Sequence, residues 1–481
     1  MKVFLMYKDQ DFDLQRKLPW NEQALTQDLE LNTLLGAMAL GDKFLFEVAK
    51  KAVLSGLNDL DTILYRQNIL RDCLKNSSIV RDIYDIATES IESEKKTYFG
   101  FFSKYPAAIL HRSIEALQIF LGMLKKLKII ADEHAGKFES EGFTAFFAML
   151  KKELGDEYFA GVQNQLKFRD GVLISAELGK GNKGANYILR KSQDKKQSWI
   201  QRIFAKKPSV YTVQISERDE SGARALAELT DRGINLVASA LAQSTDHILS
   251  FFNLLRTELA FYVGCLNLHG RLAQKGEPVS FPLPAAPGER RHSFKGLYDV
   301  CLALSLEQRI VGNDVNADNK DLVIITGANQ GGKSTFLRSI GLSQLMMQCG
   351  MFTPAESFCA NVCDGLFTHY KREEDAAMDS GKLDEELRRM SDIVDNITSN
   401  SMLLFNESFA ATNEREGSEI ARQIICALLE KRLKVFFVTH SYEFAHGFYD
   451  KKMENAIFLR AERQTDGGRT FKIIEGEPLQ T

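Results

Sequence analysis

The pattern of hydrophobic and polar positions is helical over the first half of the chain. From Asp28 to about Lys152, apolar residues recur three or four positions apart, as on the buried face of an α-helix, and Pro106 is the only proline. Residues 1–27 carry a short apolar run followed by a polar connection. We therefore predict an N-terminal arm over 1–27 and a mainly helical core domain over 28–276.

A sheet-like pattern interrupts the helices between residues 157 and 216. Apolar and β-branched runs at Gly171–Leu178 and Asn186–Leu189 are joined by glycine, lysine and asparagine, which predicts a β-hairpin. Ser209–Ile215 has the pattern of a further strand. We expect a small β region here, inserted into the helical domain.

The stretch from Ser221 to Lys275 has helical spacing throughout and contains no proline. A continuous helix of this length would extend about 75 Å, which is longer than a small domain is wide. Part of it would then serve as an arm, a lever or a dimer contact. The alternative is two ordinary core helices that break near Gly233.

Prolines mark the boundary between two halves of the chain. Four of the nine prolines lie between Pro278 and Pro287, and Gly288 follows them. Because proline disrupts both helices and central strands, this cluster predicts a linker over 277–296. We expect a second domain over 297–481.

Short apolar runs alternate with helical segments in this second domain. Such alternation predicts an α/β fold, in which helices cover a mainly parallel sheet and ligands bind at the carboxyl ends of the strands. The predicted strands are Leu322–Ile325, Met402–Phe405, Val435–Val438 and Ala456–Leu459.

The strongest chemical signal is DLVIITGANQGGKST, residues 321–335. It fits the phosphate-loop pattern G-x-x-x-x-G-K-[ST], between a run typical of a buried strand and a segment with helical spacing. In such a loop the backbone N–H groups point at phosphate, the lysine reaches the β- and γ-phosphates, and the hydroxyl binds Mg²⁺. We therefore predict ATP and Mg²⁺ as cofactors, with Ser334 on the metal. The predicted nucleotide-binding residues are Gly327, Asn329, Gly331, Gly332, Lys333, Ser334, Thr335 and Asn406.

Two further strands end in polar residues that suit the same site. The run SMLLF ends in Asn406 and Glu407, where phosphate-loop ATPases place an Asp that holds Mg²⁺ and, in many, a Glu that polarises the attacking water. Asn406 brings no negative charge, so we predict Glu407 as the base of a slow hydrolysis. The next strand ends just before His440, which we expect to contact a γ-phosphate. The alternative for His440 is a structural role.

Composition and charge limit the classes of protein to which this chain can belong. The seven cysteines are scattered, and the closest pair, Cys359 and Cys363, has no second pair at zinc-site spacing. We expect buried, reduced thiols in a cytoplasmic protein, with no signal peptide and no membrane-spanning run. The net charge of −3 argues against coating of nucleic acid by bulk electrostatics.

Positive charge is concentrated in one segment. From Lys167 to Lys207, eleven Lys or Arg accompany three acidic residues, a local balance of +8 that leaves −11 for the rest of the chain. The segment is either a solvated loop or a phosphate-binding patch. The predicted nucleic-acid contacts are Lys180, Lys183, Arg190, Lys191, Lys195, Lys196, Lys206 and Lys207.

Four longer motifs occur in order between about residues 297 and 460. They are TGANQGGKSTFLRSIGLSQLMMQCGMFTPA, FTHYKREEDAAMDSGKLDEELRRMSDIV, LLFNESFAATNEREG and FFVTHSYEF. Together they resemble the ATPase domain of the MutS family of DNA mismatch repair proteins, and the helical start is similar to that family's lever and core helices. The resemblance implies an ABC-type ATPase that forms a head-to-tail homodimer. It places Ser380 and Gly381 at the signature positions that a partner subunit supplies, and Thr412 and Asn413 in a loop near the interface.

The chain also departs from the MutS pattern. We expect no mismatch-reading or connector domain before the lever-like helices, and no nuclease domain after His440. The basic β region stands in place of the family's long DNA clamp. Asn406 stands where the family has Asp, and Ile310 stands where an aromatic residue is expected to stack on adenine.

These features favour a DNA-associated ATPase, in which ATP binding and slow hydrolysis gate a homodimer on double-stranded or branched DNA during repair or recombination. The alternative is an ATP-dependent protein-interaction switch or scaffold without direct DNA binding, which the acidic overall charge favours. Salt-dependent DNA binding distinguishes the two hypotheses.

Overall fold

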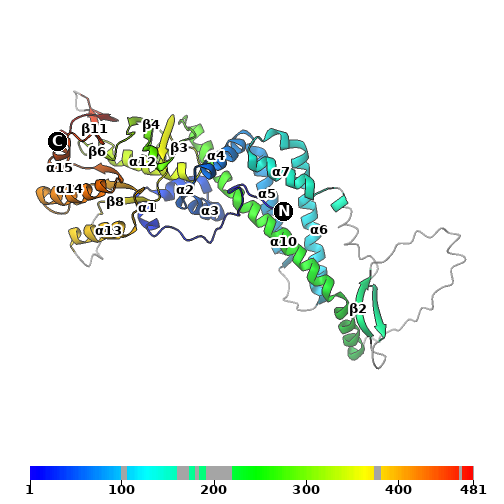
Figure 1. Cartoon of the computed structure of the whole chain (residues 1–481). Helices are drawn as coiled ribbons and strands as arrows, with labels where there is room; N and C mark the ends of the chain where they lie inside the picture. Colours follow the sequence, from blue (N-terminus) through cyan, green and yellow to red (C-terminus); the bar gives the residue numbers. More distant parts are fainter. Residues whose placement is uncertain are drawn as a thin grey trace. The chain divides into compact units, whose positions relative to one another are not determined.

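The computed structural model describes residues 1–98, 106–155, 157–159, 173–178, 184–190, 219–372, 381–464 and 468–479 (Figure 1). The chain forms two compact units. The predicted boundaries at residues 28, 277 and 297 do not separate them, because the first helices pack with the C-terminal part of the chain. The first unit contains Met1–Val3, Arg81–Gly136 and Thr144–Arg256, and the second contains Phe4–Val80, Lys137–Phe143 and Thr257–Thr481.

The first unit is mainly helical. It contains most of α5 (Ser77–Tyr98), all of α6 (Pro106–His134) and the first part of α10 (Glu220–Gln274). These helices meet through apolar side chains, and the rings of Phe120 and Phe252 lie 5.6 Å apart. The helical prediction for this region is therefore confirmed.

The predicted hairpin is confirmed as well. Strand β1 (Leu173–Leu178) pairs antiparallel with β2 (Gly184–Arg190), with an irregularity between Ser175 and Glu177. The further strand predicted at Ser209–Ile215 lies outside the described residues.

Helix α10 is continuous over 55 residues, so the long helix predicted from the spacing is confirmed and the alternative of a break near Gly233 is wrong. Among the described residues, one segment, Val237–Gln274, is long and apolar enough to cross a membrane by length and composition, although we predicted no such run. Most of its apolar window is buried within the protein, which is typical of a core helix.

The second unit begins with an irregular segment that buried polar side chains hold in place. The carboxylate of Glu258 on α10 accepts three backbone hydrogen bonds, from Leu5 at 2.6 Å and from Met6 and Phe12 at 3.1 Å. The hydroxyl of Tyr262 donates to the carbonyl of Leu5 at 2.5 Å. Because the segment forms no helix or sheet, these side chains satisfy backbone groups that burial would otherwise leave unpaired.

Short helices follow this segment, as the spacing predicts. Asp42 and Asp59 cap two of them by accepting hydrogen bonds from first-turn N–H groups. The helices are α1 (Glu22–Asp28), α2 (Leu31–Ala39), α3 (Lys43–Leu54) and α4 (Leu60–Lys75), and later α7 (Glu141–Glu153) begins in this unit.

The main sheet of the second unit has the strand order β12-β11-β6-β10-β9-β8. Its first five strands along the chain are parallel, and only the last strand runs antiparallel. All four predicted strands are present, which confirms the expected mainly parallel sheet. The bounds are β6 (Leu322–Thr326), β8 (Leu366–Tyr370), β9 (Met402–Asn406), β10 (Lys434–Val438), β11 (Ala456–Arg463) and β12 (Arg469–Glu475).

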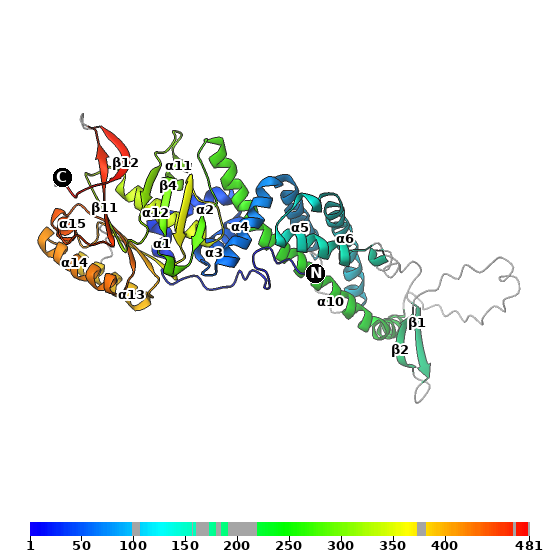
Figure 2. The same ribbon diagram turned by 45° about the horizontal axis from the view of Figure 1, so that its top comes forward.

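Helices cover both faces of this sheet. Leu403 and Phe405 of β9 join a buried apolar cluster with α13 (Lys382–Asn396), α14 (Glu414–Glu430) and α15 (Tyr442–Tyr449), and Figures 1 and 2 show these helices grouped on one side. The alternate residue Leu404 faces α12 (Lys333–Gln348), where it packs closely against Gly341. The two faces follow from the period-two alternation of a strand.

A second sheet has the strand order β3-β7-β4-β5 and is formed in part by the predicted linker. Residues 277–296 contain β3 and most of β4, so the linker prediction is wrong. The physical reason is that β3 is an edge strand, paired only with β7, and an edge strand tolerates prolines such as Pro284. The bounds are β3 (Leu283–Ala285), β4 (His292–Leu297), β5 (Asn313–Asn316) and β7 (Ser357–Asn361), with α11 (Val300–Ser305) between β4 and β5.

The seven cysteines differ in how far they are buried. All seven are free, and five are buried. Cys363 is buried, whereas Cys359 on β7 is only partly buried, so the expectation of burial holds for one member of that pair. Within the described residues, no group of three or more His, Cys, Asp or Glu side chains is placed to hold a metal ion.

Glu258 provides a test of how the N-terminal segment is fixed. Burial raises the pKa of Glu258 to about 7, against the three N–H donors that favour its charged form. An unfolded Glu titrates near a pKa of about 4.3, so the folded protein binds more protons between these two values and its stability falls as pH rises through that window. Replacement with alanine removes this pH dependence and leaves three buried N–H groups unpaired.

We expect Glu258→Ala to lower the free energy of unfolding by about 3 kcal/mol at neutral pH and to flatten its pH dependence. Urea denaturation across the pH window measures both effects. Glu47→Ala, at an exposed position on α3, is the matched control. Equal losses in the two variants, or an unchanged pH slope, would contradict this account.

Candidate nucleotide site

The loop between β6 and α12 has the conformation that its glycines allow. Gly327 and Gly332 have φ values of 123° and 89°, in the region that disfavours side chains, and Gly332 caps α12. A Cβ atom at Gly327 or Gly331 would lie 2.9 Å or 2.8 Å from the Cβ of Ala461 on β11. Glycine is therefore required at 327 for conformation and close approach, and at 331 for close approach.

Lys333 starts α12 and points into this loop. Its ammonium donates to the carbonyl oxygens of Gly327 at 2.7 Å and Ala328 at 3.0 Å. The residue is 5% exposed. Burial lowers the pKa of Lys333, and the nearby Glu407 carboxylate opposes that shift. The lysine is thus a largely buried cation at the centre of the loop.

Ser334 lies beside the end of β9. Its hydroxyl donates to the amide oxygen of Asn406 at 2.9 Å, so the structure brings these two predicted residues together. A hydroxyl and an amide oxygen are ligands that Mg²⁺ accepts, although neither carries charge. The donor set therefore fits Mg²⁺ when phosphate oxygens complete it.

Glu407 and His440 form a pair next to the lysine. The His440 Nε2 lies 3.0 Å from a carboxylate oxygen of Glu407 and 3.3 Å from the ammonium of Lys333. Glu407 has a φ of 54°, and its N–H donates to the carbonyl of Val438 at 3.0 Å. This hydrogen bond fixes the unusual backbone that turns the carboxylate toward the lysine.

Burial shifts the two titrating groups in opposite directions. It raises the pKa of Glu407, which the charge of Lys333 partly offsets. It lowers the pKa of His440, and Lys333 and Lys371 add to that shift. His440 is therefore mainly neutral near pH 7. In its Nε2–H tautomer it donates to Glu407 and makes no hydrogen bond with the Lys333 ammonium, which is also a donor.

The other predicted site residues are distributed as follows. Gly381 caps the start of α13, and Ser380 lies outside the described residues. Asn413 caps α14 by accepting from the Glu416 N–H at 3.0 Å, and the Thr412 hydroxyl donates to the Glu416 carboxylate at 2.5 Å.

Of the predicted nucleic-acid contacts, only Arg190 is described, at the end of β2, where it pairs with Leu173. The other seven lie outside the described residues. They are Lys180, Lys183, Lys191, Lys195, Lys196, Lys206 and Lys207.

Strand β12 brings two residues to the loop that no sequence motif indicates. Phe471 is 48% exposed, and its ring is the nearest group to the position that a Cβ of Gly332 would occupy, 3.7 Å away. Arg469 donates to the side-chain oxygen of Gln330 at 2.8 Å. Neither residue belongs to a motif, and only the pairing of β12 with β11 brings them here.

A second group that no motif indicates lies next to Glu407 in the chain and consists of Ser408 and its contacts with His369. Ser408, the next residue, lies 2.8 Å from Nδ1 of His369 on β8, and Nε2 of His369 lies 2.9 Å from the carbonyl of Glu386 on α13. Burial lowers the pKa of His369 to about 4, so its ring is neutral. Its Nε2–H then donates to the Glu386 carbonyl, and the Ser408 hydroxyl lies beside both Nδ1 and the carbonyl oxygen of His369.

Comparison with known proteins places this geometry in a family. Residues 58–275 match the model of the MutS2 N-terminal domain, and residues 323–476 match that of MutS domain V. The DNA mismatch repair protein MutS of Thermotoga maritima is 34% identical over 171 residues, which cover 35% of this chain and 22% of the relative. That of Clostridium perfringens is 34% identical over 172 residues, covering 34% and 18%.

The chain thus aligns with about a fifth of the length of these curated relatives. Two family models agree, and they lie in the order that the sequence motifs predict. The resemblance noted from the motifs is therefore confirmed: the chain belongs to the MutS family.

Proposed function

We propose that this chain is a Mg²⁺-dependent ATPase. The observation that carries the proposal is the convergence of five side chains at the carboxyl ends of β6, β9 and β10, the edge where nucleotides bind in α/β sheets. They are Lys333, Ser334, Asn406, Glu407 and His440.

The phosphate loop and the start of α12 bind the phosphates in this proposal. Backbone N–H groups at a helix N-terminus favour an anion, and the Lys333 ammonium exchanges its two carbonyl partners for phosphate oxygens. Mg²⁺, when bound, neutralises phosphate charge, with Ser334 Oγ and Asn406 Oδ1 as its protein oxygens, directly or through water.

Glu407 acts as the general base on water. As the water oxygen attacks the γ-phosphorus, the carboxylate takes its proton, and the bond to the β–γ bridging oxygen breaks. His440 orients the carboxylate through their 3.0 Å contact. The raised pKa of Glu407 makes its carboxylate a stronger base. Asn406 is uncharged, so the proposed Mg²⁺ ligands lack the negative charge that an Asp would bring. We therefore infer slow turnover.

A second copy of the chain completes the site in the proposed working form. We assign Ser380 and Gly381 to the signature positions from their sequence motif, and Gly381 caps α13, whose N-terminus suits a γ-phosphate. ATP then closes a head-to-tail homodimer, with Thr412 and Asn413 near the interface. A strict monomer in sedimentation velocity at saturating ATP would contradict this arrangement.

The dimer acts on DNA in this proposal, in repair or recombination. Support comes from the curated relatives, which are DNA mismatch repair proteins, and from the basic segment Lys167–Lys207. Phosphate contacts from lysines carry little base information, so we expect weak dependence on sequence.

Lys333→Ala tests the nucleotide site. The variant loses a buried charge-assisted contact to phosphate, and we expect ATP·Mg²⁺ affinity to fall about tenfold to a hundredfold. Isothermal titration calorimetry measures the affinity. Lys320→Ala is the control, because the Lys320 ammonium donates to the Glu454 carbonyl near the opposite end of β6. Wild-type affinity in Lys333→Ala would refute the assignment.

Replacing Lys195, Lys196, Lys206 and Lys207 with Glu tests the DNA proposal. We expect wild-type affinity to fall with salt at a logarithmic slope of about −4 to −5, and the variant to bind weakly across all sequences with its ATPase rate retained. Fluorescence anisotropy on matched, mismatched and four-way-junction DNA measures both effects. Absence of binding at low salt in every nucleotide state would instead favour the protein-interaction switch.

A further inference from the structure

The turn that follows β9 has an unusual backbone at the proposed base. Glu407 and Phe409 have φ values of 54° and 61°, in the left-handed region that side chains disfavour, and Ser408 lies between them. Such a backbone is costly, so it persists only where the surrounding groups hold it in place. The direction of the Glu407 carboxylate therefore depends on the groups that contact this turn.

His369 of β8 contacts both residues that follow Glu407. The Ser408 hydroxyl lies 2.8 Å from Nδ1 of His369 and also donates to the carbonyl oxygen of that residue. The ring of Phe409 stacks on the His369 ring, with the centroids 5.1 Å apart and the planes inclined by 20°. One side chain thus holds the turn through a polar contact and an aromatic contact.

Helix α13 holds both the His369 ring and the turn. Nε2 of His369 lies 2.9 Å from the Glu386 carbonyl oxygen, and the Phe409 N–H donates to the Glu386 carboxylate. Burial raises the pKa of Glu386, whereas the charge of Arg389 and the Phe409 N–H favour the ionised form. His369 is 1% exposed and Glu386 is 5% exposed, so water competes little for these contacts.

Strand β10 and helix α14 contact the turn as well. The Glu407 N–H donates to the Val438 carbonyl at 3.0 Å, and a Cβ atom at Gly417 of α14 would collide with the Phe409 carbonyl oxygen. His440 contacts the Glu407 carboxylate itself. The groups around the turn instead fix the backbone from which that carboxylate projects.

We propose that His369 is a positioning residue for ATP hydrolysis, which sets the direction of Glu407 through Ser408 and Phe409. The inference rests on the proposed function and deepens it. Both ring nitrogens of His369 face protein groups, the Ser408 hydroxyl and the Glu386 carbonyl, so the ring takes no direct part in the chemistry. Loss of its contacts should therefore slow hydrolysis and leave ATP·Mg²⁺ binding intact.

Ser408→Ala removes the hydroxyl that contacts His369. We expect the single-turnover rate of hydrolysis at saturating ATP·Mg²⁺ to fall about tenfold, because a small displacement of a general base slows proton transfer. Isothermal titration calorimetry should give the wild-type affinity for ATP·Mg²⁺. His369→Gln, whose amide can still donate to the Glu386 carbonyl but offers no ring to Phe409, should show the same loss of rate with affinity retained.

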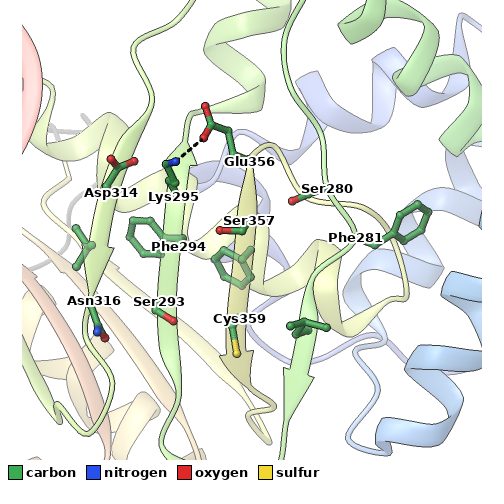
Figure 3. Close-up of a pocket in the computed structure, with 13 residues that line it drawn as sticks. Ser280, Phe281, Ser293, Phe294, Lys295, Asp314, Asn316, Glu356, Ser357 and Cys359 are labelled. Atoms are coloured by element: carbon green, nitrogen blue, oxygen red, sulfur yellow. Dashed lines mark ion pairs between the residues drawn. The ribbon is translucent and has the colours of Figure 1, made fainter.

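Ser357→Ala is the matched control. It removes a hydroxyl at an exposed position on β7, in the open groove of the four-stranded sheet (Figure 3). We expect the rate and the affinity of this variant to equal those of the wild type. Thermal unfolding of all the variants verifies that each is folded before the rates are compared.

A background without the base separates positioning from a general structural role. In Glu407→Gln the residual hydrolysis no longer uses the carboxylate, so the addition of Ser408→Ala should cause no further loss of rate. A general structural role would instead lower the rate by the same factor in both backgrounds.

The outcomes separate this inference from the proposed function. A wild-type rate in either folded variant, Ser408→Ala or His369→Gln, would overturn the positioning role alone, as would an equal loss with and without Glu407. Failure of the wild-type protein to hydrolyse ATP would overturn the proposed function and the positioning role with it.

Discussion

The close approach of the glycine-rich loop to β11 is the constraint on which the proposed nucleotide site depends. Gly327 and Gly331 pack so tightly against Ala461 that neither position has room for a side chain. Strand β11 pairs directly with β6, so the sheet itself fixes the strand that leads into the loop. Lys333 and Ser334 then follow at the first two positions of α12.

Desolvation sets the chemistry that this geometry allows. The Nε2 of His440 lies 3.0 Å from the Glu407 carboxylate and 3.3 Å from the Lys333 ammonium, in a partly buried site. Burial disfavours charge on each group, which raises the pKa of the carboxyl and lowers the pKa values of the lysine and the imidazole. A highly charged ligand that replaces these mutual contacts gains strongly from the lysine, while the carboxylate remains close enough to accept a proton.

The sequence predicts the parts of this molecule whose signals are local. The four parallel strands and α10 each have a pattern contained within one stretch, so the structure agrees with these predictions. The linker prediction failed because an edge strand and a linker both accept proline, and only the pairing of β3 with β7 distinguishes them. Phe471 and Arg469 could not be identified from the sequence, because only the pairing of β12 with β11 brings them to the loop.

In the proposed function, Ser334 and Asn406 hold Mg²⁺, directly or through water, and Glu407 is the general base of ATP hydrolysis. Single-turnover ATP hydrolysis over a range of Mg²⁺ concentrations tests it most directly, in the wild type, Asn406→Asp and Glu407→Gln. The account predicts slow wild-type hydrolysis, a lower half-saturating Mg²⁺ concentration in Asn406→Asp, and a rate about a hundredfold lower in Glu407→Gln with ATP binding retained. Equal rates in the wild type and Glu407→Gln, or an Mg²⁺ dependence that Asn406→Asp leaves unchanged, would contradict it.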